Sequence, residues 1–362
     1  MDFDFSPEQY TLRDEARRFL DERCPATHVR EFVDDPSGWS RELWKQMADL
    51  GWMALPFPEE AGGLGQSFLD LVLLLGELGR AVAPVPFLSS VGMAGQVIVR
   101  HGSADQQKRL LAGIASGERV ATVAIAEAAG SYDEAGVSCR AEQAGDAWRL
   151  TGEKRYVLDA SSADVFVVAA RAPEGVRWFV VSDGGSVRAQ RSYDLTRPIG
   201  VLTLDGVEAE PLELPGLEPG LRTCVAALCA EMVGTGSKIL DLAVSYAKER
   251  EQFGRPIGSF QAIKHKCAEM LTDLESSRSA AFYACWAAAT DASDAALAVS
   301  VAKSYCSDAL ARLGGEGVQV HGGIAFTWEH DMHLYLKRIK SAEALFGDAA
   351  FHRERIAQLV GF

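Results

Sequence analysis

The hydrophobic pattern of this sequence changes its period twice along the chain, and this limits the folds that the chain can adopt. Residues 1–118 carry apolar residues at helical spacing, as in QYTLRDEARRFLDERC and SRELWKQMADLGW. Residues 119–215 contain short β-branched and aromatic runs, such as VFVVAAR and RWFVVS, separated by Gly, Asp and Ser. Residues 216–362 return to long helical patterns. We therefore expect three domains with these boundaries.

This order predicts an α+β protein with an N-terminal helical domain, a central antiparallel β domain and a C-terminal four-helix bundle. A Rossmann domain is not expected, because strands and helices do not alternate and the sequence has no G-x-G-x-x-G motif. Ser6 and Gln9 predict a capping box at the first helix, and TGEK after Leu150 predicts the turn of a hairpin. The bundle is predicted to begin with one long helix ending at SYAKER, followed by three more: 260–289, 293–313 and 332–360.

The composition excludes several classes of function. The net charge of −14 over 362 residues argues against nucleic-acid binding and against a basic membrane-surface helix. The N-terminal MDFDFSPEQY is acidic where an export signal is basic, and the apolar run LVLLLGELG is too short to span a bilayer. The seven cysteines form no CxxC pair, so we expect reduced core thiols in a cytoplasmic protein.

Two glycine-containing corners carry the residues with the clearest chemical potential. EREQFGRPIGSFQ joins two predicted helices, and VQVHGGIAF follows a third. Adjacent glycines let a backbone approach a flat or phosphorylated ligand, and Arg with Gln and backbone amides can hold a pyrophosphate. The simpler interpretation is that Arg250 is a favourable charge at a helix C-terminus and that Phe253 packs in the core.

With these motifs, the chain resembles the acyl-CoA dehydrogenase family over almost its whole length. The resemblance rests on the α–β–α order and on EEAGGLG, GEKRYV, REQFGRPIGSFQAIKH and QVHGGIAFTWE. It implies FAD as cofactor, an acyl-CoA thioester as substrate and an electron-transferring flavoprotein as acceptor. In this family a glutamate removes the α-proton while the flavin accepts the β-hydride.

The resemblance also implies that FAD lies across a subunit interface, so that the motifs form two sets. The set that would hold the pyrophosphate and adenine end of a neighbouring chain's FAD matches the family pattern throughout. It comprises Arg250, Gln252, Phe253, Gln261, Gln319, Gly322 and Gly323.

The set that would contact the chain's own flavin departs from the family pattern. Residues 126–133 read AEAAGSYD, where the family has TEPGAGSD. This chain retains Glu127 and Asp133, but its glycines and serine are displaced. Tyr156 and Leu158 stand where the family has a tryptophan and a hydroxyl residue that hydrogen-bonds the flavin. Leucine cannot donate such a bond, which leaves a buried flavin atom unpaired at a cost of roughly 1–3 kcal/mol.

The catalytic base of the family is also missing from its usual place. By spacing from the glycine pair, that position falls on Phe346, or on Gly347 with a shift of one residue. A second position used in the family falls on Cys224, and Glu231 is the remaining carboxylate on that helix, two turns further on. Glu231 is thus the candidate base, but only for an unusual substrate position. Weaker candidates flank the missing residue: Glu343 and Asp348.

One further pattern, WEHDMH, places His330 and His333 at i, i+3. Such a pair can ligate a metal, but the family needs none and surface or interface histidines share this spacing. We therefore predict no metal site.

Taken together, these residues predict a subunit that completes a partner's FAD site without building its own. The chain resembles the non-catalytic partner subunit of heterotetrameric actinobacterial acyl-CoA dehydrogenases of the sterol side-chain type. Two alternatives remain open. One is a self-sufficient homotetrameric dehydrogenase that uses Glu231 or a shifted carboxylate, and the other is a non-enzymatic acyl-CoA-binding scaffold that retains only the fold.

Overall fold

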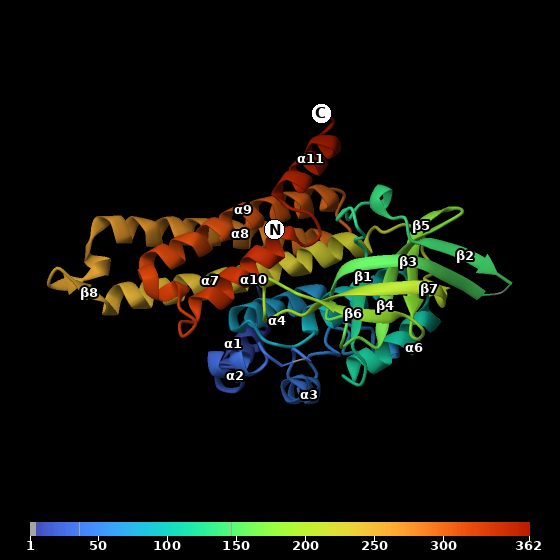
Figure 1. Cartoon of the computed structure of the whole chain (residues 1–362), viewed down its shortest axis with the longest axis horizontal. Helices are drawn as coiled ribbons and strands as arrows, with labels where there is room; N and C mark the ends of the chain where they lie inside the picture. The colour runs from blue at the N-terminus through green and yellow to red at the C-terminus, as the bar shows by residue number, and fades with distance from the viewer. Residues whose placement is uncertain (1–4, 36, 146) are drawn as a thin grey trace.

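A strand-rich lobe lies at one end of a long helical bundle, and N-terminal helices pack against both (Figure 1). The computed structural model describes residues 5–35, 37–145 and 147–362. The predicted fold class is confirmed: helices come first, then one sheet, then helices again. Figure 1 shows the bundle extending well beyond the sheet, with the short strand β8 at its far tip.

Four of the N-terminal helices begin at a serine cap, namely Ser6, Ser40, Ser67 and Ser103. Ser6 accepts a hydrogen bond from the Gln9 amide while the Gln9 side chain accepts one from Ser6, which confirms the predicted capping box. Helix α4 buries one apolar face and packs against the first helix of the bundle. The elements are α1 (Pro7–Arg23), α2 (Ala26–Glu31), α3 (Arg41–Asp49), η1 (Glu59–Ala61), α4 (Phe68–Ala81), the π-helical η2 (Leu88–Ala94), α5 (Gly95–His101) and α6 (Ala104–Ala115).

The central sheet is mainly antiparallel, with parallel pairings between β1 and β4 and between β2 and β4. Because β5 pairs with both β4 and β7, the strands close around a second core that includes Phe166, Phe179 and Leu202. The strands are β1 (Ala121–Ala124), β2 (Arg140–Ala144), β3 (Ala147–Leu158), β4 (Val165–Ala172), β5 (Gly175–Val181), β6 (Ser186–Gln190) and β7 (Ile199–Pro211), with a short η3 (Glu134–Gly136) before β2.

The predicted turn at TGEK is wrong, because β3 continues through it. The hairpin instead joins β2 to β3, where Ala144 pairs with Ala147. Gly152 reflects a different constraint: β3 shifts register against β7 next to it, and a Cβ on Gly152 would lie 2.9 Å from the Cys139 backbone. The glycine therefore marks a bulge with close backbone approach rather than a chain reversal.

Five helices form the C-terminal part. They are α7 (Gly220–Glu249), α8 (Gln261–Ala289), α9 (Ala295–His321), α10 (Met332–Ala344) and α11 (Ala349–Val360). Short elements connect them: β8 (Glu251–Gln252), β9 (Arg255–Pro256), η4 (Ile257–Ser259) and η5 (Gly322–Phe326). The long first helix is confirmed, but two predicted bounds are wrong.

The helix predicted to end at residue 313 continues to His321, because the glycines beyond that point provide close packing rather than a stop. A Cβ on Gly317 would lie 2.6 Å from Ile239 of α7. The helix predicted for 332–360 is in fact two helices. It breaks where Phe346 and Gly347 adopt positive φ values of 58° and 95°, and Asp348 then caps α11.

Helix α7 is long and apolar enough to cross a membrane, but 89% of its most apolar window is buried inside the protein. This is the pattern of a core helix. Each of the seven cysteines is free, and all except the half-buried Cys267 are fully buried, as predicted.

Candidate functional site

The residues predicted to serve a neighbouring chain lie at the tip of the bundle, at the opposite end from this chain's own sheet (Figure 1). Arg250 is the C-cap of α7, and the β8–β9 hairpin follows it directly. The stacked rings of Tyr246 and His321, 4.6 Å apart, join this corner to the end of α9. The two motifs are therefore one continuous feature.

This corner has unpaired groups and little packing of its own. Phe253 is 93% exposed with φ 56°, so the alternative that it packs in the core is wrong. Arg250 is exposed and forms no ion pair with any described residue. A left-handed phenylalanine in water and an uncompensated guanidinium are features that a ligand or a second chain would stabilise.

The glycine pair is equally open. Gly322 has φ 68°, which favours glycine, and a Cβ added to Gly322 or Gly323 would meet no atom within 4 Å. Gln319 and Gln261 are exposed on the adjoining helix ends. The glycines therefore leave backbone free for a ligand rather than filling a need of the chain's own core.

Two buried aromatic side chains pack against each other beside Leu158, one of the positions predicted to contact the chain's own flavin. Tyr132 is 8% exposed and Phe346 3%, and their ring centroids are 5.2 Å apart. Burial raises the pKa of Tyr132 to about 12, opposed in part by a hydrogen bond with the Phe346 backbone. The pocket lined by these two rings and Leu158 has a volume of only about 10 Å³, about the space of one water.

Two buried side chains hold the loop that carries Phe346 through hydrogen bonds to its backbone. Lys303 Nζ donates to the backbone oxygens of Glu343 and Gly347, at 2.9 and 2.8 Å, and its burial lowers its pKa to about 8. His352 Nε2 donates to the Phe346 oxygen at 3.0 Å, and burial lowers the pKa of this imidazole to about 3. Phe346 is thus held in its inward position.

The remnants of the flavin motif have structural roles. Lys154 Nζ donates to Glu127 at 2.7 Å, and the amides of Ser138 and Cys139 also donate to this carboxylate. Asp133 accepts from the Ser131 hydroxyl at 2.7 Å and caps η3. These contacts stabilise the loop before β2.

The candidate base Glu231 is held in a buried ion-pair network. It is 4% exposed, and Arg197 and Arg338 each donate to one of its two oxygens, Arg338 at 3.2 Å. Arg338 Nε also donates to Asp194 at 2.7 Å. A carboxylate with both oxygens bound to guanidinium groups is poorly suited to removing a proton.

The other candidate positions offer no better base. Phe346 and Gly347 have no titratable side chain, and full burial raises the pKa of the Cys224 thiol. Glu343 pairs with Lys340, and Asp348 accepts from the Phe351 amide at 2.8 Å.

The histidine pair is engaged within its own loop. The His330 ring lies 4.7 Å from His321, and His333 stacks on Trp328 at 4.9 Å. No group of three or more His, Cys, Asp or Glu side chains suited to a metal occurs among the described residues.

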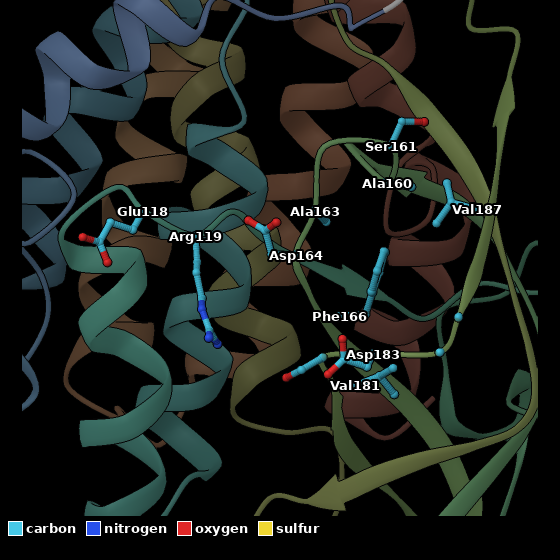
Figure 2. Close-up of a pocket in the computed structure, with 13 residues that line it drawn as sticks. Glu118, Arg119, Ala160, Ser161, Ala163, Asp164, Phe166, Val181, Asp183 and Val187 are labelled. Atoms are coloured by element: carbon cyan, nitrogen blue, oxygen red, sulfur yellow. The ribbon is translucent and has the colours of Figure 1, made fainter.

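Two larger pockets open on the β lobe. One, of about 600 Å³, lies at the mouth of the closed sheet, where Arg119, Asp164, Phe166 and Asp183 are among the residues that line it (Figure 2). It contains none of the predicted site residues. The other, of about 580 Å³, lies beside Tyr132 and Tyr156 and extends to α10.

Sequence reasoning missed Tyr132 as the residue that packs against Phe346, and it missed the two arginines around Glu231. Tyr132 stands within AEAAGSYD where the family has serine, so the sequence itself could have indicated that a large side chain occupies this position. The contacts of these arginines with Glu231 could not be predicted, because Arg197 and Arg338 lie 34 and 107 residues from Glu231 in the sequence.

Comparisons with known proteins agree with this architecture. Residues 6–118 match the model of the acyl-CoA dehydrogenase N-terminal domain, and residues 222–361 match that of the acyl-CoA dehydrogenase C-terminal domain. Acyl-CoA dehydrogenase IpdE2 of Mycobacterium tuberculosis is 33% identical over 341 residues, covering 93% of this chain and 92% of that protein.

Two solved structures are similar throughout. A steroid acyl-CoA dehydrogenase, the Tcur3481–Tcur3483 G363A variant, superposes with a TM-score of 0.92 at 32% identity, covering 98% of this chain and 97% of the other. The ChsE4–ChsE5 complex from M. tuberculosis superposes with a TM-score of 0.92 at 29% identity, with both chains fully covered.

The chain therefore belongs to the acyl-CoA dehydrogenase family. Members of this family are FAD-dependent oxidoreductases that act on CH–CH bonds.

Proposed function

We propose that this chain is the flavin-silent subunit of a cytoplasmic heterotetrameric acyl-CoA dehydrogenase, and that its bundle tip completes the FAD site of a catalytic partner. The observation that carries the proposal is a contrast between two ends of one molecule. The tip presents Arg250 and the Gly322–Gly323 pair to solvent, whereas Tyr132 and Phe346 fill the chain's own ring position.

The residues at the tip suit the phosphate end of the cofactor. Arg250 supplies an unpaired guanidinium, which can bind a phosphate through two parallel hydrogen bonds. Gln252, Gln261 and Gln319 supply amides, and Phe253 supplies a flat surface for the adenine. These residues would hold the pyrophosphate and adenine end of FAD, which would supply a hydride acceptor for acyl-CoA oxidation, with an electron-transferring flavoprotein as the expected electron acceptor.

The residues at the other end do not suit the ring of the cofactor. The pocket at Leu158 has a volume of only about 10 Å³, and no carboxylate occupies the predicted base position at Phe346 or Gly347. The two arginines bound to Glu231 disfavour the alternative of a self-sufficient homotetramer with Glu231 as base. The two similar solved structures support a heteromeric assembly, since the names of both give two proteins.

The proposal is tested by removing the guanidinium from the tip. In the complex co-expressed with its partner, Arg250→Ala is expected to weaken FAD binding by about tenfold or more, because a charge-assisted phosphate contact is lost. The matched control is Arg188→Ala, which removes an exposed arginine on β6, away from the tip. Full flavin retention in Arg250→Ala would contradict the proposal.

A further inference from the structure

The pocket beside Tyr156 has the size of a small-molecule site. It measures about 580 Å³ and lies between the end of β3, residues 190–193 and α10. Ligand pockets are typically about 300–1,000 Å³. Its inner wall is Tyr132, beyond which only about 10 Å³ remains next to Phe346. The pocket is thus an outer chamber that is closed on the inside.

The charge of this chamber is opposite to that of the whole chain. Its lining contains two cationic side chains, Arg191 and Lys340, and no carboxylate, although the net charge of the protein is −14. Lys340 pairs with Glu343 outside the lining, whereas Arg191 has no ion-pair partner in the described part of the chain. The local field therefore favours an anion.

The remaining lining is aromatic and apolar. Tyr156 and Tyr193 are 39% and 64% exposed, and Ile199, Ala344 and Leu345 complete the surface. Lys337 Nζ lies 5.9 Å above the Tyr193 ring, which places a third cation at the rim. Exposed tyrosine faces bind flat or polycyclic rings well.

We propose that this chamber binds a ring-bearing organic anion smaller than FAD, with its rings against Tyr156 and Tyr193 and its anionic group at Arg191 and Lys340. The inference rests on the proposed function, because the chamber is free for another ligand only if the chain binds no flavin of its own.

The test uses two probes that differ by one charged group. 8-Anilinonaphthalene-1-sulfonate and N-phenyl-1-naphthylamine share the same rings, but only the first carries a sulfonate. In the full chain and in the complex, the sulfonate probe is expected to saturate one charge-dependent site on this chain.

Removing the two charges separates the contributions. Arg191→Gln with Lys340→Gln is expected to raise the Kd of the sulfonate probe by about tenfold or more and that of the neutral probe by less than about threefold. Arg188→Gln, on the neighbouring strand and outside the chamber, is the matched control. Both exchanged side chains are exposed, so the variants retain the fold.

Competition then identifies the source of the anion. Displacement of the probe by cholate assigns a polycyclic carboxylate, and displacement by AMP assigns an aromatic phosphate. Three results would overturn the inference. They are an equal loss of affinity for both probes in the double variant, the lack of a saturable site, and no displacement by either competitor. A lone chain purified with FAD contradicts the proposed function, whereas a flavin-free chain without the charge-dependent site contradicts only this inference.

Discussion

The ring of Tyr132 lies 5.2 Å from the ring of Phe346, tilted by 35°, and the two rings pack together between the β domain and the helical bundle. Neither residue is near the other in sequence: one precedes β2 and the other joins α10 to α11. The contact therefore ties the β domain to the bundle.

Truncating this contact should cost stability. Phe346→Ala is expected to lower the free energy of unfolding by about 3 kcal/mol, because it empties a buried aromatic site. Phe346→Gly empties the same site but relieves the positive φ of 58°, worth about 1 kcal/mol, and should be the less destabilising change. Urea unfolding of both variants measures the difference. If Phe346→Gly has the lower free energy of unfolding of the two variants, the backbone is not strained at this position.

Replacing Glu231 should affect stability and spare turnover. Glu231→Gln leaves Arg197 and Arg338 with less negative charge in a buried site and is expected to cost about 3 kcal/mol. The kcat of the folded complex should stay nearly unchanged, because the base belongs to the partner. Asp308→Asn, at the exposed ion pair with Arg353, is the control. A loss of several orders of magnitude in kcat would identify Glu231 as the base instead.

Asp159 should contribute a component of stability that falls as the pH rises through the acid range, opposite in sign to the contribution of the buried His352. Burial raises the pKa of this carboxyl to about 6, opposed by the hydroxyl of Ser89, which donates to it at 2.5 Å. The folded state therefore binds a proton that the unfolded state releases near pH 3.8, so this stabilising contribution is full below that pH and is lost by about pH 6.

The shift corresponds to roughly 3 kcal/mol between these limits. Unfolding followed from pH 4 to pH 7 in parallel for the natural chain and Asp159→Asn measures it, and the amide variant should lose this part of the slope. An unchanged slope in the variant would assign the pH dependence to other groups.

Much of the fold could be predicted from local patterns. The change from helical to strand-like periodicity, the Ser6–Gln9 capping box and the long α7 each depend on residues close together in sequence. The prediction of a turn at TGEK failed because its glycine lies against Cys139, just before β2, and a local sequence pattern does not record this contact. The break between α10 and α11 was not predicted for a similar reason. Lys303 of α9 and His352 of α11 hold the backbone of this loop by hydrogen bonds, which the local sequence of the loop does not reveal.

The candidate site divides in the same way. The residues of the bundle tip occur in two short motifs, so their grouping was predictable except for the exposure of Phe253. The contacts of Glu231 were not predictable, because Arg197 lies in the loop before β7 and Arg338 lies in α10. Tyr132 was visible within AEAAGSYD, but only the structure shows that its ring meets Phe346.

The most direct test of the silent-subunit account is to count FAD in the chain purified alone and in the chain co-purified with its acyl-CoA dehydrogenase partner. The account predicts no flavin absorbance for the lone chain, and about one FAD for every two chains in the complex. A lone chain that holds about one FAD per subunit would contradict the account and describe a self-sufficient enzyme.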